Sequence, residues 1–173
     1  MYIENGWLRA ITFIFIWFLT VGTFQIAGFE ILERSWNDPF DDLSVNEHLL
    51  TMCFTCMATL FTLIFFKKFV DREPLSEAGI TAKHAWPLFG IGALTGVLVM
   101  TSGFFILISL GEIVVAQNPV QPLDLFKGVL LYLLVSLNEE FVMRGYIQVN
   151  LARSMNPYLA LIISACLFSV LHI

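Results

Sequence analysis

Two adjacent carboxylates and an arginine interrupt an apolar run near the C-terminal end of the sequence, at Glu139, Glu140 and Arg144. Ten uncharged, mostly hydrophobic residues, 128–137, precede them, and a histidine follows further along at His172. An ionisable side chain at the centre of a membrane helix costs about 2.5–3.5 kcal/mol on insertion scales, so such residues usually mark a functional site. This group of residues is therefore the first candidate for chemistry.

Regular helix geometry gives the two glutamates different tasks. Glu140 and Arg144 are four residues apart, so they lie on one helix face and can form an ion pair that holds Glu140 ionised. Glu139 lies about 100° around the helix axis, where it is free to face a cavity. A carboxylate in a partly dry, apolar site is suited to act as a general base. The spacing thus predicts Glu139 as the catalyst and the Glu140–Arg144 pair as its support.

A count from a predicted turn places His172 at the depth of Glu139. If two helices form a hairpin that turns at residues 154–157, both side chains lie roughly 21–23 Å from the turn at a rise of about 1.5 Å per residue. Phe168 is four residues before His172, so we expect it to pack beside the imidazole. A glutamate and a histidine that converge on one water form a hydrolytic dyad, or supply two ligands of a metal site.

The composition predicts an all-α membrane helix bundle. Of the 173 residues, 58% are hydrophobic and 13% are charged, whereas soluble domains contain about 25% charged residues. The net charge of −5 and the lack of a basic stripe argue against nucleic acid as a partner and leave the lipid bilayer as the surroundings. A single transmembrane domain is expected, with about five transmembrane helices near residues 10–29, 49–66, 86–110, 125–153 and 157–173.

The lysines and arginines predict the orientation of these helices. If the helices alternate in direction, seven basic residues fall on one side of the membrane and two on the other, which predicts a cytoplasmic N-terminus. The seven are Arg9, Lys67, Lys68, Arg72, Lys83, Arg144 and Arg153, and the two are Arg34 and Lys127. The cysteines Cys53, Cys56 and Cys166 all lie in apolar runs and are interpreted as small membrane-helix residues.

The pattern Glu139-Glu140-x-x-x-Arg144 followed by Phe168-x-x-x-His172 resembles the first two motifs of the CAAX prenyl protease and bacteriocin-processing family (CPBP, also called Abi). Members of this family are polytopic intramembrane endopeptidases. The resemblance implies that Glu139 and His172 activate the attacking water, and that the other three residues support the site. It also implies a membrane-associated or lipidated protein or peptide as the substrate.

The resemblance covers mainly residues 125–173. It leaves the cofactor open between zinc, held by Glu139 and His172, and no metal at all. Bacterial relatives are linked to bacteriocin maturation or self-immunity, so a bacterial cell membrane is the expected location. The family normally adds a later helix with a histidine and an asparagine or aspartate that stabilise the oxyanion. We therefore expect a truncated chain or an incomplete reading frame, weak or inactive in this form, because losing oxyanion donors costs about 10²–10³ in rate.

Other interpretations of these residues compete with a protease. The acidic pair and Arg144 would be a solvated ion pair if they ended a helix at the membrane surface, although the stretch after them stays apolar. A non-catalytic membrane immunity or binding protein would keep Glu139 and His172 as a structural relic. A small transporter would use them as a proton or cation relay, which requires a continuous polar path. Beyond Gln148 and Asn150 the sequence indicates no such path toward the outer side.

Overall fold

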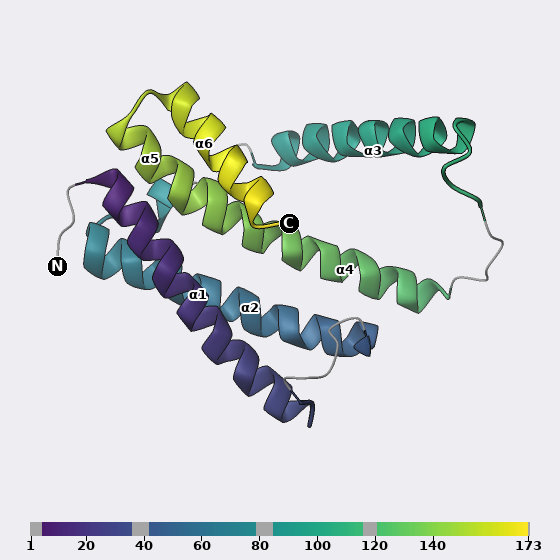
Figure 1. Ribbon diagram of the computed structural model, residues 1–173, viewed down its shortest axis with the longest axis horizontal. Coiled ribbons are helices and arrows are strands. Elements are labelled where there is room, and N and C mark those ends of the chain that lie inside the picture. Colours follow the sequence, from purple (N-terminus) through teal and green to yellow (C-terminus); the bar gives the residue numbers. More distant parts are fainter. Residues whose placement is uncertain (1–4, 36–41, 79–84, 116–120, 173) are drawn as a thin grey trace. The chain divides into compact units, whose positions relative to one another are not determined.

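The computed structural model describes residues 5–35, 42–78, 85–115 and 121–172. Every regular element in these residues is a helix, as Figure 1 shows. The predicted all-α class is therefore confirmed. Lys83, which contributed to the predicted orientation, and Ile173, the last residue of the fifth predicted helix, lie outside the described residues.

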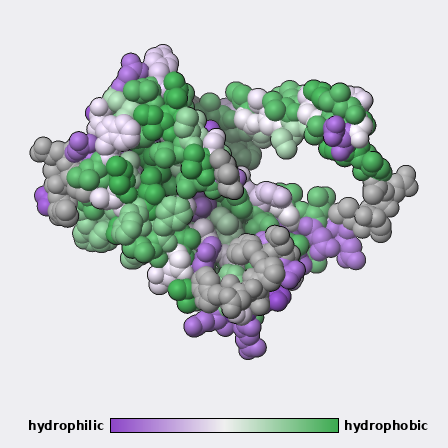
Figure 2. Space-filling model, viewed as in Figure 1, coloured by the Kyte–Doolittle hydropathy of each residue, from purple (hydrophilic) through white to green (hydrophobic). Residues whose placement is uncertain are grey.

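Three helices of the described residues are long and apolar enough to cross a membrane: Gly6–Ile31, Val45–Asp71 and Trp86–Ser109. They overlap the first three predicted segments. The apolar helix Pro157–Val170 overlaps the fifth segment but is shorter. In Figure 2, hydrophobic residues cover most of the helix surfaces, and hydrophilic residues gather mainly near helix ends. The protein is a helical membrane bundle.

The chain folds into two compact units. The larger unit contains residues 1–80 and 122–173, and the smaller unit contains residues 81–121. The helix of the smaller unit is α3 (Ala85–Ser109), and Gly111, which follows its end, has a φ of 76°. The N–H groups of Gly111 and Glu112 donate to carbonyls of the last turn, each at 3.0 Å, and so form a Schellman motif. Glycine adopts this left-handed conformation without steric cost, so the residue type sets the end of α3.

The larger unit packs α1 (Gly6–Ile31) against α2 (Val45–Phe65), as Figure 1 shows. Polar side chains cap both helices. Asn5 accepts a backbone N–H at the start of α1, and Ser44 and Glu47 form a capping box at the start of α2. These caps satisfy N–H groups that the helices leave unpaired, so they determine where each helix begins.

An aromatic cluster of Phe13, Phe66 and Tyr146 fills the core of the larger unit. The rings of Phe13 and Tyr146 stack with centroids 4.0 Å apart. Phe66 meets Phe13 edge-on at 5.2 Å and Tyr146 at 5.6 Å. All three side chains are buried, and each such pair contributes about 0.5–1.5 kcal/mol beyond its buried area.

Gly6 allows α1 to approach α5 (Val149–Ser154) closely. Its N–H donates to Ser154 Oγ at 2.9 Å. A Cβ atom at this position would lie 2.0 Å from the carbonyl oxygen of Asn150, far inside van der Waals contact. Small residues permit such close approach of membrane helices. The absence of a side chain at Gly6 therefore sets the separation of these two helices.

Two segments depart from the regular α-helix that the sequence predicts. The π-helix η2 (Phe66–Asp71) continues α2, and the π-helix η4 (Glu140–Gln148) joins α4 (Pro122–Glu139) to α5. The segment predicted near 125–153 is therefore three consecutive helices of two kinds. π-Helical turns are rare and occur frequently at functional sites. Here η4 begins directly after Glu139.

An ionic cluster, buried at one end and partly exposed at the other, joins α1, η2 and α5. Its cations are Arg9, Lys67 and Arg153, and its anions are Asp71 and Glu73. Lys67 Nζ lies 3.5 Å from Asp71 Oδ2 and 3.2 Å from Glu73 Oε2. Arg9 Nε lies 3.6 Å from Asp71 Oδ1, and Arg153 Nη1 lies 2.6 Å from Glu73 Oε1. Arg9, Lys67 and Asp71 are all at most 3% exposed, so the structure buries two of the basic residues that the charge count used.

The same cluster shifts the pKa of Glu73, which lies outside the membrane spans, between η2 and the 3-10 helix η3 (Leu75–Ala78). Burial alone raises the pKa of this carboxyl. The hydrogen bonds and positive charges of Arg153 and Lys67 outweigh burial and hold the pKa below its usual value. The carboxylate of Glu73 is therefore ionised at neutral pH and ties three helices together.

Candidate active site

A helical hairpin carries the candidate site. α5 ends at Ser154, and Asn156 caps α6 (Pro157–Val170) by accepting the N–H of Tyr158 at 2.9 Å. Proline at the first helical position is compatible with a helix start, because its missing N–H would be unpaired there in any case. The turn lies where the sequence predicts it, and α6 folds back against η4, as Figure 1 shows.

The hairpin brings Glu139 and His172 into contact. Glu139 Oε1 lies 3.2 Å from His172 Nε2. The ring of Phe168 packs against the imidazole with centroids 4.2 Å apart, and the Phe168 carbonyl oxygen lies 2.7 Å from His172 Nδ1. The structure thus places all three residues together, as the count along the hairpin predicts.

The contact between His172 and Glu139 requires that one of the two side chains carries a proton at the shared position. A carbonyl oxygen only accepts, so His172 Nδ1 carries a proton and donates it to the Phe168 carbonyl. In a neutral ring, Nε2 would then present a lone pair to a carboxylate oxygen, which also only accepts. The 3.2 Å contact is a hydrogen bond only if one of the two groups holds a proton. The pair can therefore take up or release a single proton, as general acid–base chemistry requires.

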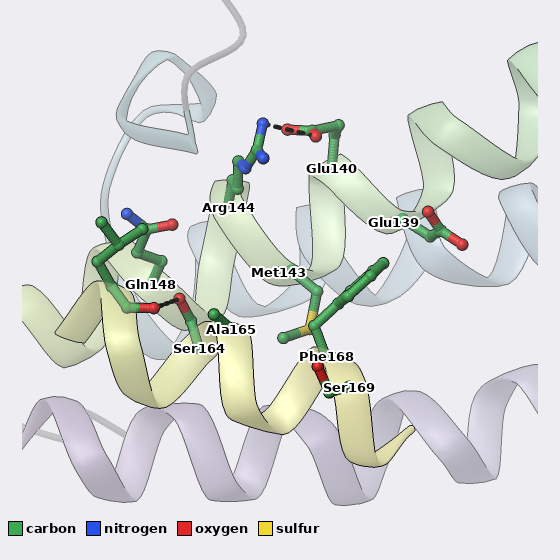
Figure 3. A pocket seen from close by; sticks show the side chains of 10 residues that line it. Glu139, Glu140, Met143, Arg144, Gln148, Ser164, Ala165, Phe168 and Ser169 are labelled. Atoms are coloured by element: carbon green, nitrogen blue, oxygen red, sulfur yellow. Dashed lines mark hydrogen bonds and ion pairs between the residues drawn. The ribbon is translucent and has the colours of Figure 1, made fainter. Parts of the chain in front are cut away.

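The second glutamate forms the predicted ion pair. Arg144 Nη1 lies 2.8 Å from Glu140 Oε1. The side chains of Arg144 and Glu140 are 71% and 50% exposed, respectively. In Figure 3 the pair lies on one side, and the carboxylate of Glu139 points away from it. The two glutamates thus have different surroundings, even though η4 is not the regular helix on which their roles were predicted.

Glu139 lines two cavities. The first has a volume of about 270 Å³, and the second, of about 220 Å³, also contains His172. The first offers carboxylate, guanidinium, amide and hydroxyl groups beside thioether, aromatic and aliphatic side chains (Figure 3). Its lining residues are Glu139, Glu140, Met143, Arg144, Gln148, Leu161, Ser164, Ala165, Phe168 and Ser169. A molecule with both polar and apolar parts would find partners for each beside Glu139.

The family model described as type II CAAX prenyl endopeptidase Rce1-like matches residues 121–173, from the start of α4 to the end of the chain. The match covers less than a third of the chain, so it shows that this segment is similar to the Rce1-like family. No curated protein and no solved structure matches the chain. The Rce1-like family is a protease family of integral membrane proteins, and its segment in this chain contains the whole helical hairpin with Glu139 and His172.

Asn138, directly before Glu139, takes part in a polar contact that the sequence did not predict. Asn138 is only 8% exposed and contacts the hydroxyl of Thr59 on α2. Trp17 of α1 donates its Nε1–H to the same hydroxyl at 2.7 Å. The residue directly before Glu139 is therefore bound to α2, and α1 binds the same threonine hydroxyl. The signal in the sequence was an uncharged polar side chain next to the acidic pair.

The described part of the chain does not supply a complete metal site. Among the described residues, no group of three or more His, Cys, Asp or Glu side chains could hold a metal ion. Catalytic zinc sites use three protein ligands, and Glu139 with His172 supplies two. In the described part of the chain, Glu139 and His172 are therefore one ligand short of a catalytic zinc site.

Proposed function

We propose that this chain is an intramembrane endopeptidase in which Glu139 and His172 activate water. The observation that carries the proposal is the 3.2 Å contact between Glu139 Oε1 and His172 Nε2, within the segment that matches a protease family. An acid–base pair at a cavity is the minimum that hydrolysis of a peptide bond requires.

In the proposed reaction, a water molecule enters between the two side chains, and Glu139 takes one of its protons. The hydroxyl oxygen adds to the carbonyl carbon of the substrate, whose oxygen becomes an oxyanion. The C–N bond then breaks, and the proton passes from the pair to the leaving nitrogen. The products are a carboxylic acid and an amine. His172, oriented by the Phe168 carbonyl, shares the proton with Glu139 throughout.

The supporting pair has a second task in this proposal. Glu140 and Arg144 are exposed to the first cavity, so they can hydrogen-bond polar groups of an extended peptide. Met143, Leu161 and Phe168 line the same cavity and can contact an apolar chain. A lipidated peptide combines these two features. The family name points to prenylated proteins, and we propose a membrane-associated or prenylated peptide as the substrate class.

The test is cleavage of a farnesylated fluorogenic peptide with a C-terminal CAAX sequence by the chain in liposomes. We expect slow but measurable cleavage by the unaltered chain, since the sequence predicts weak activity for this form. Glu139→Gln and His172→Ala should lose at least about 10²-fold of that rate, because each lacks one half of the acid–base pair. Glu112→Gln is the matched control, since it neutralises an exposed glutamate beyond the end of α3.

Equal cleavage by Glu139→Gln and by the unaltered chain would refute the catalytic assignment. The thermal melting midpoint of each variant shows whether a loss of cleavage comes from the missing side chain or from unfolding. Repeating the assay with a metal chelator decides between the two cofactor alternatives, since chelation inhibits only a metal-dependent reaction.

A further inference from the structure

A third cavity reaches Glu139 from the beginning of α2. It has a volume of about 330 Å³ and lies between α1, α2 and α4 of the larger unit. Its lining residues are Gln25, His48, Thr51, Met52, Thr55, Leu131, Tyr132, Val135, Asn138 and Glu139. His48 lies in the first turn of α2, and Asn138 and Glu139 lie at the end of α4. Asn138 and Glu139 also line the cavity that contains His172, so these two residues border both cavities.

Two threonines, Thr51 and Thr55, form part of one wall of this groove, which we call the α2 groove. They are four residues apart and buried, so they lie on one face of α2. The hydroxyls of Thr51 and Thr55 donate to carbonyls one turn earlier, at 3.0 and 3.1 Å, and keep their oxygens as acceptors. Gln25 of α1 donates to Thr55 Oγ1 at 3.3 Å. The wall therefore carries polar groups along its length.

The orientation of the Asn138 amide follows from its partners. The indole N–H of Trp17 can only donate, so Thr59 Oγ1 accepts it and must send its own proton to Asn138. Asn138 Oδ1 is thereby occupied as an acceptor, which leaves the NH₂ group for a donor role. Among the described residues, the hydrogen bond of Asn138 runs through its Oδ1, and none involves its side-chain nitrogen. A donor on a side chain that is more than nine-tenths buried thus remains available at a residue that lines both cavities.

We propose that the α2 groove is a water passage that leads from the beginning of α2 to Glu139. A water molecule occupies about 30 Å³ and needs two to four polar partners, so the groove has room for several. Hydroxyl oxygens of Thr51 and Thr55, the amide of Gln25 and the Asn138 NH₂ group supply such partners at successive depths. Polar side chains in a membrane helix usually face protein or a water-filled cavity, and these two threonines line the groove.

The passage rests on the proposed function in one respect, because hydrolysis consumes one water at Glu139 per turnover. It also supplies the polar path that the sequence did not indicate, since its members come from three helices. An acyl chain or an apolar helix is the competing occupant, because the apolar side chains Met52, Leu131 and Val135 also line the groove.

Cysteine accessibility tests the passage and does not depend on catalysis. The probe is a positively charged, membrane-impermeant methanethiosulfonate, added to the chain in liposomes from the side at which α2 begins. A Val45→Cys variant at the first residue of α2 identifies that side. The background replaces the three native cysteines by alanine. Met52→Cys and Thr55→Cys then report on the groove, and a variant that retains only Cys53 reports on an exposed position outside the groove lining.

We expect both groove cysteines to react at least about ten-fold faster than Cys53, because the reagent attacks thiols that water reaches and ionises. Cys53 is the matched control, since it neighbours Met52 at nearly the same depth. Reaction of both groove cysteines as slowly as Cys53 would overturn the passage and indicate that an apolar group fills the groove. Two independent groove variants and a melting curve for each guard against misfolding. The peptide-cleavage assay is separate, so fast labelling without cleavage would refute the protease and leave the passage standing.

Discussion

Lys67 provides the sharpest test of how the larger unit is held together. Its ammonium group is 1% exposed and lies 3.5 Å from Asp71 and 3.2 Å from Glu73. At 3.2 Å and an effective dielectric constant of about 20, one such pair is worth roughly 5 kcal/mol before the cost of desolvation. Removing one partner of a buried ion pair destabilises proteins by about 3–5 kcal/mol, because the other charge stays buried without compensation. We therefore expect Lys67→Met to lose about 3 kcal/mol, the lower end of this range.

The neighbouring Lys68 is the control, because it belongs to the same π-helix but is exposed. Lys68→Met is expected to change stability by less than about 0.5 kcal/mol. Thermal unfolding in detergent, followed by tryptophan fluorescence, measures both variants. For a chain of this size about 3 kcal/mol corresponds to roughly 6–12 °C in the midpoint.

A second substitution checks the electrostatic origin of the loss. Lys67→Met leaves two cations and two anions in the cluster. Glu77 lies 3.7 Å from Arg153 and adds a third anion, so negative charge is then in excess. Adding Glu73→Gln removes one anion near the missing ammonium, so the double variant should recover part of the lost midpoint. Equal midpoints for Lys67→Met and Lys68→Met would refute the reasoning, since burial is what distinguishes the two lysines.

Three further predictions concern other parts of the larger unit. Because the pKa of Glu73 is lowered in the folded state, its contribution to stability is complete above its unfolded value of about 4.3 and is lost as the pH falls through the folded value. The melting midpoint should thus fall on acidification, and less steeply in Glu73→Gln. Gly6→Ala should lower the midpoint by the equivalent of about 2 kcal/mol or more, because its Cβ would collide with a carbonyl oxygen of α5, whereas Gly22→Ala, with no atom within 4 Å, should be neutral or slightly stabilising. Glu140→Gln should change the midpoint by less than about 1 kcal/mol, because the ion pair with Arg144 is exposed, and a larger loss would show a structural role that the exposure does not explain.

The sequence predicts the hairpin site well because its geometry is local. Helix rise sets the depth of Glu139 and His172 from a turn that Asn156 and Pro157 mark. The ion pair of Glu140 with Arg144 needs a separation of only four residues. These relations depend on backbone geometry within one hairpin, so counting along the chain is sufficient to place them.

The ionic cluster and the α2 groove could not be predicted in the same way. Glu73 and Arg153 are separated by 80 positions, and Thr59 and Asn138 by 79. Hydropathy presents the α2 threonines as small residues of an apolar helix and gives no indication of which helix they face. Only packing of three helices turns these side chains into partners. The π-helical form of η4 was missed for a related reason, since a 3.6-residue period assumes regular hydrogen bonding.

The sequence by itself determined the helical membrane class, the hairpin and the acid–base candidates, because composition and periodicity act through the local chain. The tertiary structure decided which polar groups are buried together: Lys67 with its carboxylates, and Asn138 with Thr59 and Trp17. Buried polar groups need partners, and the partners of these come from distant parts of the chain. These pairs form only when the helices pack against one another, so the sequence alone does not identify them.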